Sequence, residues 1–330
     1  MIYVESRDTD PYRNLALEQF VFDKLKDEQG CFMLWQNQNA IIVGKHQNTN
    51  EEINAAFVKE KNIAVVRRLS GGGAVYHDLG NLNFTFITAA DKNKGIDFYA
   101  FCRPISEALS SLGVPVEIMG RNDMTVEGKK FSGNAQYIKE GRVMHHGTIL
   151  YDSDLDLLSL ALKPVDDKIE SRGIKSLRSR VTNIRPYMKT DMSVLEFWAA
   201  LKKHLCAAFD LREFALTVEH KAAVEDLRGK VYSQWSWNYG TSPPYTLRKE
   251  RRIEGCGKIE ILLDVGHEGK IKNIAFYGDF FASRDPSELK NKLIGHHLEH
   301  EELKAALAGM AVSQYFHNLE TKDFLDLIMV

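Results

Sequence analysis

Three consecutive glycines follow a pair of arginines in this chain, and this run limits the folds open to it more than any other feature. The segment 67–78 has the sequence RRLSGGGAVYHD. Glycines lack a Cβ, so their backbone N–H groups can approach an oxyanion closely and adopt positive φ. Arginine adds a planar fork of donors that suits phosphate or carboxylate. The segment therefore predicts an anion-binding loop, with a plain glycine turn between strands as the alternative.

The spelling of this loop excludes two common phosphate-binding folds. No segment has the Gly-x-x-x-x-Gly-Lys-Ser/Thr pattern of a Walker loop. In the Gly-x-Gly-x-x-Gly fingerprint of dinucleotide-binding domains, Gly71 and Gly73 fit, but Tyr76 occupies the last position. A nucleotide held by this loop is therefore held in another fold.

The flanking residues predict strands on both sides of the loop. Residues 63–66 form an apolar run, and residues 78–81 (DLGN) form a turn sequence before an alternating strand at 82–87. We expect the glycine loop at a sheet edge, on a hairpin that buries one face. That face carries Leu82, Phe84 and Phe86.

A second polar cluster occupies the segment 120–135 (GRNDMTVEGKKFSGNA). Glu127 and Gly128 predict a hairpin tip, with Lys129 and Lys130 at the start of the returning strand. Successive strand residues point to opposite faces, so only one of the two lysines can enter a given site. Lysine suits a mobile point charge on a phosphate, and a solvated hairpin tip is the alternative.

Three further segments complete the pattern. Residues 143–150 (VMHHGTIL) predict a strand with His145 and His146 on opposite faces, and the others are 44–48 (GKHQN) and 173–183 (GIKSLRSRVTN). Together the five motifs, spread over roughly residues 1 to 240, resemble the lipoate–protein ligases of the biotin/lipoate ligase family. Each motif alone is modest, but the ordered combination is specific.

The resemblance implies an adenylate-forming reaction. Lipoate would be joined to AMP from ATP with release of pyrophosphate, with Mg²⁺ helping to stabilise charge on the phosphoryl oxygens. A lysine of a lipoyl-acceptor domain would then displace AMP. The implied acceptors are E2 subunits of 2-oxoacid dehydrogenases or the glycine-cleavage H protein, and octanoate is a possible substrate in place of lipoate.

The resemblance also implies roles for matched positions. Lys130 corresponds to the family's essential lysine, between the lipoyl carbonyl and the phosphate. The positions implied for ATP or the adenylate are Arg68, Gly73, Ala74, Val75, Tyr76, Lys130 and Asp123. Those implied around the lipoyl group are Ser70, His77, Lys130, Ala135 and His146. Asp123 would orient Lys130 or bind Mg²⁺, unless it only terminates a turn. His145 is expected to be a packed sheet residue.

Two loops carry less direct expectations. The basic segment 173–183 would close over the adenylate as a lid that excludes water, or would be a plain solvated loop. The segment 44–48 would line the lipoyl tunnel, with Ile42 and Val43 as its apolar wall.

Composition and charge agree with an enzyme of this class. Forty-three basic against 45 acidic residues leave a net charge of −2, so charge favours neither nucleic acid nor membrane as a partner. The N-terminal residues lack the pattern of a signal peptide, and no apolar run is long enough to span a bilayer, so we expect a cytoplasmic protein. The four scattered cysteines are expected to be reduced and mostly packed: Cys31, Cys102, Cys206 and Cys256.

The 330 residues predict an α+β protein of α/β character in two domains. We expect a catalytic domain of mixed β-sheet flanked by helices over residues 1–242, and a small α+β accessory domain over 243–330. Predicted helices begin at Pro11, capped by Asp10, and cover residues 98–112 and 194–209. In the small domain we expect strands at 258–263 and 271–277, a helix face with Leu289, Leu293 and His297, and a last helix with Phe324, Leu325 and Leu327. Trp235 and Trp237 are expected to pack at the domain junction, and the family default is a monomer.

Other functions stay open at this point. An octanoyl or lipoyl transferase of the same superfamily would not need ATP, and a non-enzymatic lipoyl carrier is a weaker alternative. Biotin ligases carry a Gly-Arg-Gly-Arg stretch, which residues 120–123 do not spell. The sequence HHLEH at 296–300 matches a zinc-protease motif, although Gly295 and the following glutamates favour a solvated surface.

Overall fold

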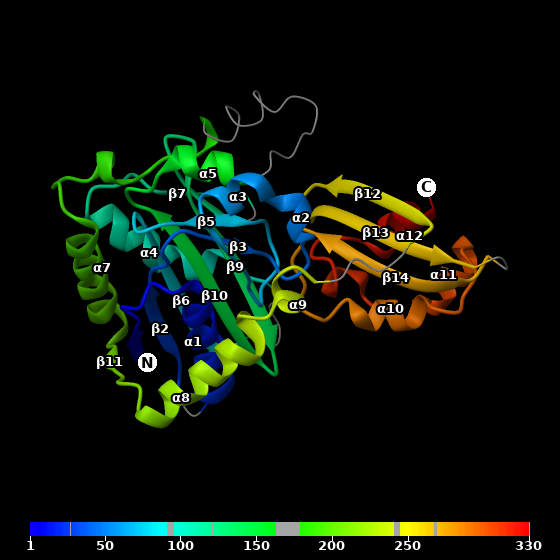
Figure 1. Cartoon of the computed structure of the whole chain (residues 1–330), viewed down its shortest axis with the longest axis horizontal. Helices are drawn as coiled ribbons and strands as arrows, with labels where there is room; N and C mark the ends of the chain where they lie inside the picture. Colours follow the sequence, from blue (N-terminus) through cyan, green and yellow to red (C-terminus); the bar gives the residue numbers. More distant parts are fainter. Residues whose placement is uncertain are drawn as a thin grey trace.

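The structure is a computed structural model that describes residues 1–26, 28–90, 96–120, 122–162, 179–240, 245–266 and 269–329. It has a large N-terminal domain built on an eight-stranded sheet and a small C-terminal domain built on a three-stranded sheet (Figure 1). The expected mixed sheet flanked by helices, with an additional small α+β domain, is confirmed. The expected boundary between residues 242 and 243 lies outside the described residues.

The large sheet is mixed in direction. In spatial order its strands are β11 (Arg212–Glu213), β1 (Ile2–Glu5), β2 (Cys31–Trp35), β6 (Asn81–Ala89), β10 (Arg142–Leu150), β9 (Lys129–Lys139), β8 (Asp123–Val126) and β7 (Glu117–Met119). The first three run parallel to one another, and every later pair is antiparallel. Strands β6, β10 and β9 form its centre, and β9 and β10 carry the predicted site residues Lys130, Ala135 and His146.

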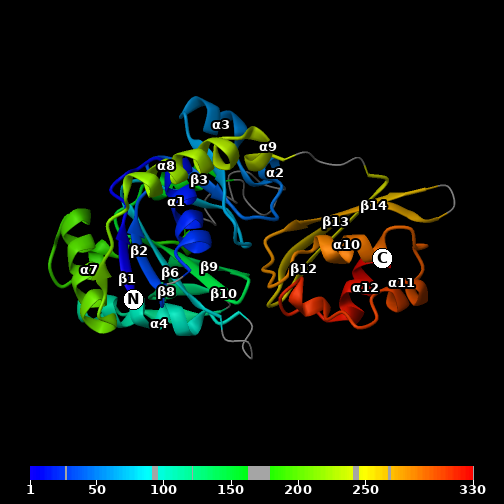
Figure 2. The ribbon, with the colours of Figure 1, turned by 90° about the horizontal axis from the view of Figure 1, so that it is seen from below.

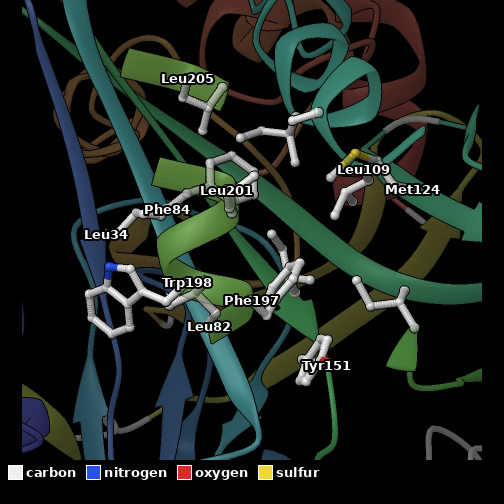
Figure 3. Packing of buried hydrophobic residues seen from close by; sticks show 14 of the residues in the cluster. Leu34, Leu82, Phe84, Leu109, Met124, Tyr151, Phe197, Trp198, Leu201 and Leu205 are labelled. Atoms are coloured by element: carbon white, nitrogen blue, oxygen red, sulfur yellow. The ribbon is translucent and has the colours of Figure 1, made fainter. Parts of the chain in front are cut away.

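Helices cover both faces of this sheet. The side chains of Phe32 and Leu34 in β2 pack with α4 (Tyr99–Ser111) and α7 (Val194–Phe209). Figure 3 shows this cluster, with Leu34 and Phe84 beside residues of α7. The alternate β2 residues face α1 (Pro11–Lys24) and α8 (Val218–Leu227). Both faces of β6 are therefore buried, so the expectation of a single buried face is wrong. The second face carries the polar residues Asn81, Asn83 and Thr85.

The helix predictions are confirmed where local signals were strong. Asp10 caps α1, accepting hydrogen bonds from the backbone N–H groups of Tyr12 and Arg13, and Pro11 is its first residue. Helix α7 spans the predicted residues and begins with a reciprocal capping box between Ser193 and Glu196.

A second sheet carries the glycine loop. Its strands are β4 (Ala64–Arg67), β3 (Ala40–Val43) and β5 (Val75–His77), in that spatial order, and α2 (Thr49–Glu52), α3 (Ala55–Glu60) and α5 (Leu155–Ala161) lie near them. The glycine loop joins its two outer strands. The predicted hairpin of β5 and β6 is wrong, because β5 pairs with β3 while β6 lies between β2 and β10. The turn at 78–81 instead carries the chain from one sheet to the other.

The C-terminal domain is an antiparallel meander with helices on one side (Figure 1). Its elements are β12 (Leu247–Ile253), β13 (Gly257–Val265), β14 (Ile271–Gly278), α10 (Ser287–Leu293), α11 (His300–Ala306) and α12 (Thr321–Met329). Strands β13 and β14 and the buried residues of α12 are confirmed. The sequence prediction missed β12, whose sequence LRKERRI is largely charged, as edge strands often are. His297 lies beyond the end of α10, so it does not share the predicted face with Leu289 and Leu293.

The positions of His296 and His300 argue against the zinc-protease alternative. Helix α11 begins at His300, so His296 is outside it and the two do not share a helix face. The Nδ1 atoms of His296 and His297 lie 3.1 and 2.9 Å from the carboxylate of Glu302 instead. Within the described part of the chain, no group of three metal-ligating side chains comes together.

Short helical turns complete the chain, and these are η1 (Arg185–Tyr187), η2 (Arg228–Tyr232), α9 (Trp235–Asn238) and η3 (Val312–Gln314). Trp237 donates from Nε1 to the carbonyl of Arg67 at 2.9 Å and packs as expected, whereas Trp235 is exposed and that expectation is wrong. Three of the four cysteines are buried, as predicted. None of the helices among the described residues is long and apolar enough to cross a membrane.

The two domains touch through the loop after β14 (Figure 2). The N–H of Gly278 donates to the carbonyl of His46 at 2.9 Å, and the His46 ring stacks on Phe280 with 4.7 Å between ring centroids. Phe281 is fully buried against Phe98 of the large domain. The C-terminal domain therefore lies against the glycine loop and the segment 44–48.

Candidate active site

Two adjoining cavities lie where β9, β10 and the glycine loop meet. The inner cavity, of about 100 Å³, extends toward Leu15, Trp35 and Ile42. The outer cavity, of about 1050 Å³, opens between the two domains. Both are lined by Ala74, Val75, Lys130, Gly133 and Thr148. Lys130 is thus placed where a molecule in one cavity would meet a molecule in the other.

The predicted site residues gather around these cavities. The outer cavity is lined by the predicted nucleotide residues Ala74, Val75, Tyr76, Asp123 and Lys130. The inner cavity is lined by Arg68, Gly73, Ala74, Val75, His77, Lys130, Ala135 and His146. Gly73 and Arg68, expected at the nucleotide, therefore lie on the inner side of the shared wall. Ser70 stands behind the wall and reaches it through His146.

Arg68 shapes the glycine loop from within. Its Nη2 donates to the carbonyls of Gly71 and Gly73 at 2.7 and 2.8 Å, and its Nη1 donates to the carbonyl of Ile42 at 3.0 Å. Burial lowers the pKa of Arg68 to about 10, so it remains charged near neutral pH. The sequence suggested a guanidinium turned to an anion. In the structure, these donors instead form hydrogen bonds to backbone carbonyls.

Arg67 does the same for the neighbouring segment 44–48. Its Nη1 donates to the carbonyls of Gly44 and Gln47, both at 2.8 Å, and its Nη2 donates to Thr49 Oγ1 at 2.7 Å. This segment faces the C-terminal domain and does not line the inner cavity, so its tunnel role stays a prediction. Of the expected apolar wall, Ile42 lines the inner cavity and Val43 does not.

The two cavity-facing glycines of the loop differ in what they tolerate. Gly72 has a φ of +89°, and a Cβ there would lie 2.9 Å from Cε1 of Phe281. At Gly73 a Cβ would meet nothing within 4 Å, so its backbone borders open space. Gly72 is needed for the turn itself, whereas Gly73 leaves room beside the cavity wall.

Lys130 stands on the predicted hairpin of β8 and β9. Glu127 and Gly128 form its tip with φ of +51° and +72°, which confirms the predicted turn. Lys130 Nζ lies 2.8 Å from Asp123 Oδ1 and forms an ion pair with it. Lys129 is exposed and lines neither cavity. Strand alternation thus separated the two lysines as expected.

Part of the predicted lid also reaches this point. The N–H of Thr182 donates to the carbonyl of Lys130 at 2.9 Å, and Val181 forms a bridge with the same residue. Arg180 and Val181 line the outer cavity. The remainder of the predicted lid, residues 173–178, lies outside the described residues.

A buried hydrogen-bond chain runs behind the inner cavity. Glu18 Oε1 lies 2.9 Å from His146 Nδ1, and because a carboxylate accepts, that nitrogen carries the proton. His146 Nε2 lies 2.6 Å from Ser70 Oγ, and Ser70 Oγ accepts from Arg68 Nε at 3.0 Å. Arg68 is therefore the donor at one end of this chain, and Glu18 is the acceptor at the other.

The chain has a second branch on the β2–β6 side. Thr85 Oγ1 donates to Glu18 Oε1 at 2.7 Å, and Trp35 Nε1 donates to Thr85 Oγ1 at 2.9 Å. Glu18 is 2% exposed and is the common acceptor of both branches. Sequence reasoning missed it. The signal available was a glutamate among the mostly apolar buried residues of α1, since glutamate is seldom fully buried without a partner.

The other histidine of β10, His145, is a packed residue of the sheet, as predicted. His145 is fully buried, stacks on Phe101 with 4.9 Å between ring centroids, and contacts Gln136 and Asn134 through its two ring nitrogens. Burial holds its pKa well below the usual range, so it is neutral.

The C-terminal domain supplies a wall of the outer cavity that sequence reasoning did not foresee. This wall consists of Glu250, Arg251, Arg252, Lys258 and Asp279. The guanidinium of Arg252 lies 3.3 Å from Asp279 Oδ2. These groups come from β12, β13 and the residue after β14, and they give this wall of the outer cavity charges of both signs.

The chain is similar to known proteins over both of its domains. The family described as "Lipoyl protein ligase A/B catalytic domain" matches residues 10–206, and the one described as "Bacterial lipoate protein ligase C-terminus" matches residues 242–328. The chain is 44% identical to lipoate-protein ligase LplJ of Bacillus subtilis, covering 99% of this chain and all of that protein.

Two solved structures are similar as well. The bi-partite lipoate protein ligase of Thermoplasma acidophilum, solved with its E2 lipoyl domain, is 28% identical with a TM-score of 0.64, covering 74% of this chain and 98% of that one. A lipoate-protein ligase A bound with ATP is 27% identical with a TM-score of 0.59, covering 72% of this chain and 97% of that one.

Proposed function

The chain belongs to the lipoyl protein ligase family and is an ATP-dependent lipoate–protein ligase, and we propose that its reaction takes place where the inner and outer cavities meet at Lys130. This placement of the reaction rests on the wall, including Lys130, that the two cavities share. The narrow inner cavity, with apolar groups at its far end, suits an acyl chain, and the larger charged outer cavity suits ATP. The lipoyl carboxylate then meets the α-phosphate beside Lys130.

In the first half-reaction, a carboxylate oxygen of lipoate attacks the α-phosphorus of ATP. A carboxyl O–P bond forms, the bond to the bridging oxygen breaks, and pyrophosphate leaves. Negative charge gathers on the phosphoryl oxygens, where the Lys130 ammonium is placed to stabilise it. The ion pair with Asp123 holds that ammonium at the cavity junction before substrates bind.

In the second half-reaction, an acceptor lysine amine attacks the lipoyl carbonyl and AMP leaves. No nucleophile from this chain is required, because positioning and charge stabilisation supply the rate. The amine would enter through the outer cavity, which is the wider of the two. We propose a lipoyl domain of E2 type as acceptor, since the similar archaeal ligase was solved with its E2 lipoyl domain. The glycine-cleavage H protein is the second candidate.

Asp123 is suited to help hold Mg²⁺. Its carboxylate lines the outer cavity, and its Oδ1 lies 2.8 Å from Lys130 Nζ. A carboxylate oxygen is a hard ligand of the kind Mg²⁺ prefers, and one carboxylate together with substrate phosphates is a common arrangement. When bound, the ion supplies positive charge to the phosphate oxygens.

The glycine loop and the C-terminal wall would enclose the nucleotide. Ala74, Val75 and Tyr76 contribute one side of the outer cavity and β12 the other. Enclosure matters because lipoyl-AMP is a mixed anhydride that water would hydrolyse. We propose that the C-terminal domain excludes water from this intermediate, in addition to any lid formed by the segment 173–183.

Replacing Lys130 tests the placement. Lys130→Ala should lower pyrophosphate release from ATP and lipoate by about 10²–10³-fold, the usual loss for one charge-stabilising donor. The matched control is Lys129→Ala, the neighbouring exposed lysine, which should stay within about twofold of the wild type because surface changes away from a site are nearly neutral. Equal losses in both variants, or a loss only at Lys129, would contradict the assignment.

A further inference from the structure

The C-terminal domain supplies three of the cations that line the outer cavity. Among the described residues, five cationic side chains line this cavity. Lys130 and Arg180 come from the large domain. Arg251, Arg252 and Lys258 come from β12 and β13. The phosphates of ATP carry several negative charges, so cations other than Lys130 are needed to hold them.

Arg252 and Lys258 form a cross-strand pair on the open face of the C-terminal sheet. They are register partners across β12 and β13. Their sequence neighbours Ile253 and Ile259 pack in the core of the domain, so strand alternation directs this pair to the other face. Residues directly opposite each other on antiparallel strands have Cβ atoms about 4.5–5.5 Å apart. The guanidinium and the ammonium can therefore contact the same anion.

Both cations are held loosely by carboxylates of the same wall. Arg252 Nη2 lies 3.3 Å from Asp279 Oδ2, and Lys258 Nζ lies 3.4 Å from Glu250 Oε2. A well-formed hydrogen bond between a charged nitrogen and a carboxylate measures about 2.7–2.9 Å. The Arg252 and Lys258 side chains are also 54% and 33% exposed, and exposed ion pairs contribute little stability. Exchanging these carboxylates for a phosphate therefore costs little.

The direction of the reaction points the leaving group into the outer cavity. In the reaction proposed above, the carboxylate of the acid reaches the α-phosphorus from the inner cavity. In an in-line displacement the leaving oxygen departs on the side remote from the attacking oxygen. Pyrophosphate would therefore depart away from the inner cavity. Arg252 and Lys258 line the outer cavity and not the inner one.

Resting on the function proposed above, we infer that Arg252 and Lys258 bind the β- and γ-phosphates of ATP and stabilise pyrophosphate as it leaves. When the bond from the α-phosphorus to the bridging oxygen breaks, both electrons of that bond stay with pyrophosphate. The two cations stabilise this growing charge. Lys130 acts on the α-phosphoryl oxygens, so the two domains stabilise different parts of one transition state.

Variants of the full chain that remove one charge each test this assignment. Arg252→Met and Lys258→Met keep an apolar side chain of similar length. Each should lower kcat/KM for ATP, measured by pyrophosphate release with lipoate, by about 10- to 100-fold, the range for losing one charge-assisted hydrogen bond. Arg252→Lys retains the charge and should lose less than Arg252→Met.

The matched control is Lys249→Met, which removes a positive charge from the same strand. Lys249 does not line the outer cavity, and its register partner is the buried Ile261 of the domain core. The kcat/KM of this variant for ATP should stay within about twofold of the wild type, because changes away from a site are nearly neutral.

Binding of inorganic pyrophosphate and of AMP separates a phosphate contact from a general loss of structure. Both ligands are titrated calorimetrically in the presence of Mg²⁺. Each Met variant of the pair should bind pyrophosphate about tenfold or more weakly, whereas the Kd for AMP should not change, because AMP lacks the β- and γ-phosphates.

Two results would overturn the inference. One is an unchanged kcat/KM for ATP together with an unchanged Kd for pyrophosphate in either folded Met variant. The other is an equal weakening of pyrophosphate and AMP binding, which would show that the substitution only loosens the domain contact. Absence of pyrophosphate release by the wild type with ATP and lipoate would instead refute the proposed function, whereas the pyrophosphate titrations still report whether Arg252 and Lys258 bind phosphate.

Discussion

Replacing Glu18 by alanine would remove the one acceptor shared by two buried donors, His146 Nδ1 and Thr85 Oγ1. Each donor left unsatisfied costs about 1–3 kcal/mol, so we expect a loss of about 4 kcal/mol in the free energy of unfolding. Glu18→Gln keeps an oxygen in place and exchanges two charge-assisted bonds for neutral ones, which should cost about 2 kcal/mol.

Calorimetric thermal unfolding of the free protein measures both losses. A change of 1 kcal/mol shifts the Tm of a domain of this size by about 2–4 °C, so the large-domain transition should fall by about 8–16 °C in Glu18→Ala. The corresponding fall in Glu18→Gln is about 4–8 °C. The control is Glu107→Ala on α4, where the carboxylate is exposed and pairs with exposed Arg103. That variant should change stability by no more than about 0.5 kcal/mol.

The ranking of the variants is as informative as their size. If Glu18→Ala melts within about 2 °C of Glu107→Ala, a shift no larger than a surface change produces, then Glu18 is not the acceptor that holds His146. If the Tm of Glu18→Gln falls as far as that of Glu18→Ala, the buried donors require the negative charge and not only an acceptor oxygen.

Three further predictions concern the domain contact and the glycine loop. Burial and the nearby Asp279 carboxylate raise the pKa of Glu52 to about 7, so the stability that its protonated form contributes is present below pH 4.5 and lost as the pH rises through 7. Glu52→Gln should therefore be more stable than the wild type by about 2 kcal/mol at pH 8.5 and not at pH 5, measured by Tm at each pH. Gly73→Val should raise the KM for ATP more than that for lipoate, because the new side chain enters the open space beside the cavity wall; equal changes would indicate a misfolded loop. Phe281→Ala should remove the buried contact with Phe98 and loosen the two domains, seen as a larger radius of gyration in X-ray scattering, and an unchanged radius would show that other contacts hold them.

The features that the sequence predicted correctly depend on short-range backbone preferences. The helix start at Pro11 requires a capping side chain one residue before it, and Asp10 provides it. The hairpin at Glu127 and Gly128 requires two residues that accept positive φ, and strand alternation then separates Lys129 from Lys130. Motif order added the family, because five short segments in sequence are more specific than any one of them.

The errors arose where a partner lies far along the chain. The turn after β5 predicts a hairpin equally well whether the next strand pairs with β5 or crosses to another sheet, and only the packing of β6 between β2 and β10 decides this. The guanidinium donors of Arg67 and Arg68 suit a phosphate and a backbone carbonyl equally well. Local sequence cannot distinguish these uses, because the carbonyls that accept become available only when the loops fold together.

By itself, the sequence determined several of the helices and strands, the glycine loop, the lysine that lies between the cavities and the family to which they belong. The tertiary structure alone decided what surrounds them. Glu18 holds His146 from 128 residues away, and β12 lines the outer cavity although its own sequence predicts only an exposed charged stretch. Backbone conformation is set within a few neighbouring residues, whereas the direction of a hydrogen bond or the wall of a cavity exists only once distant segments are packed together.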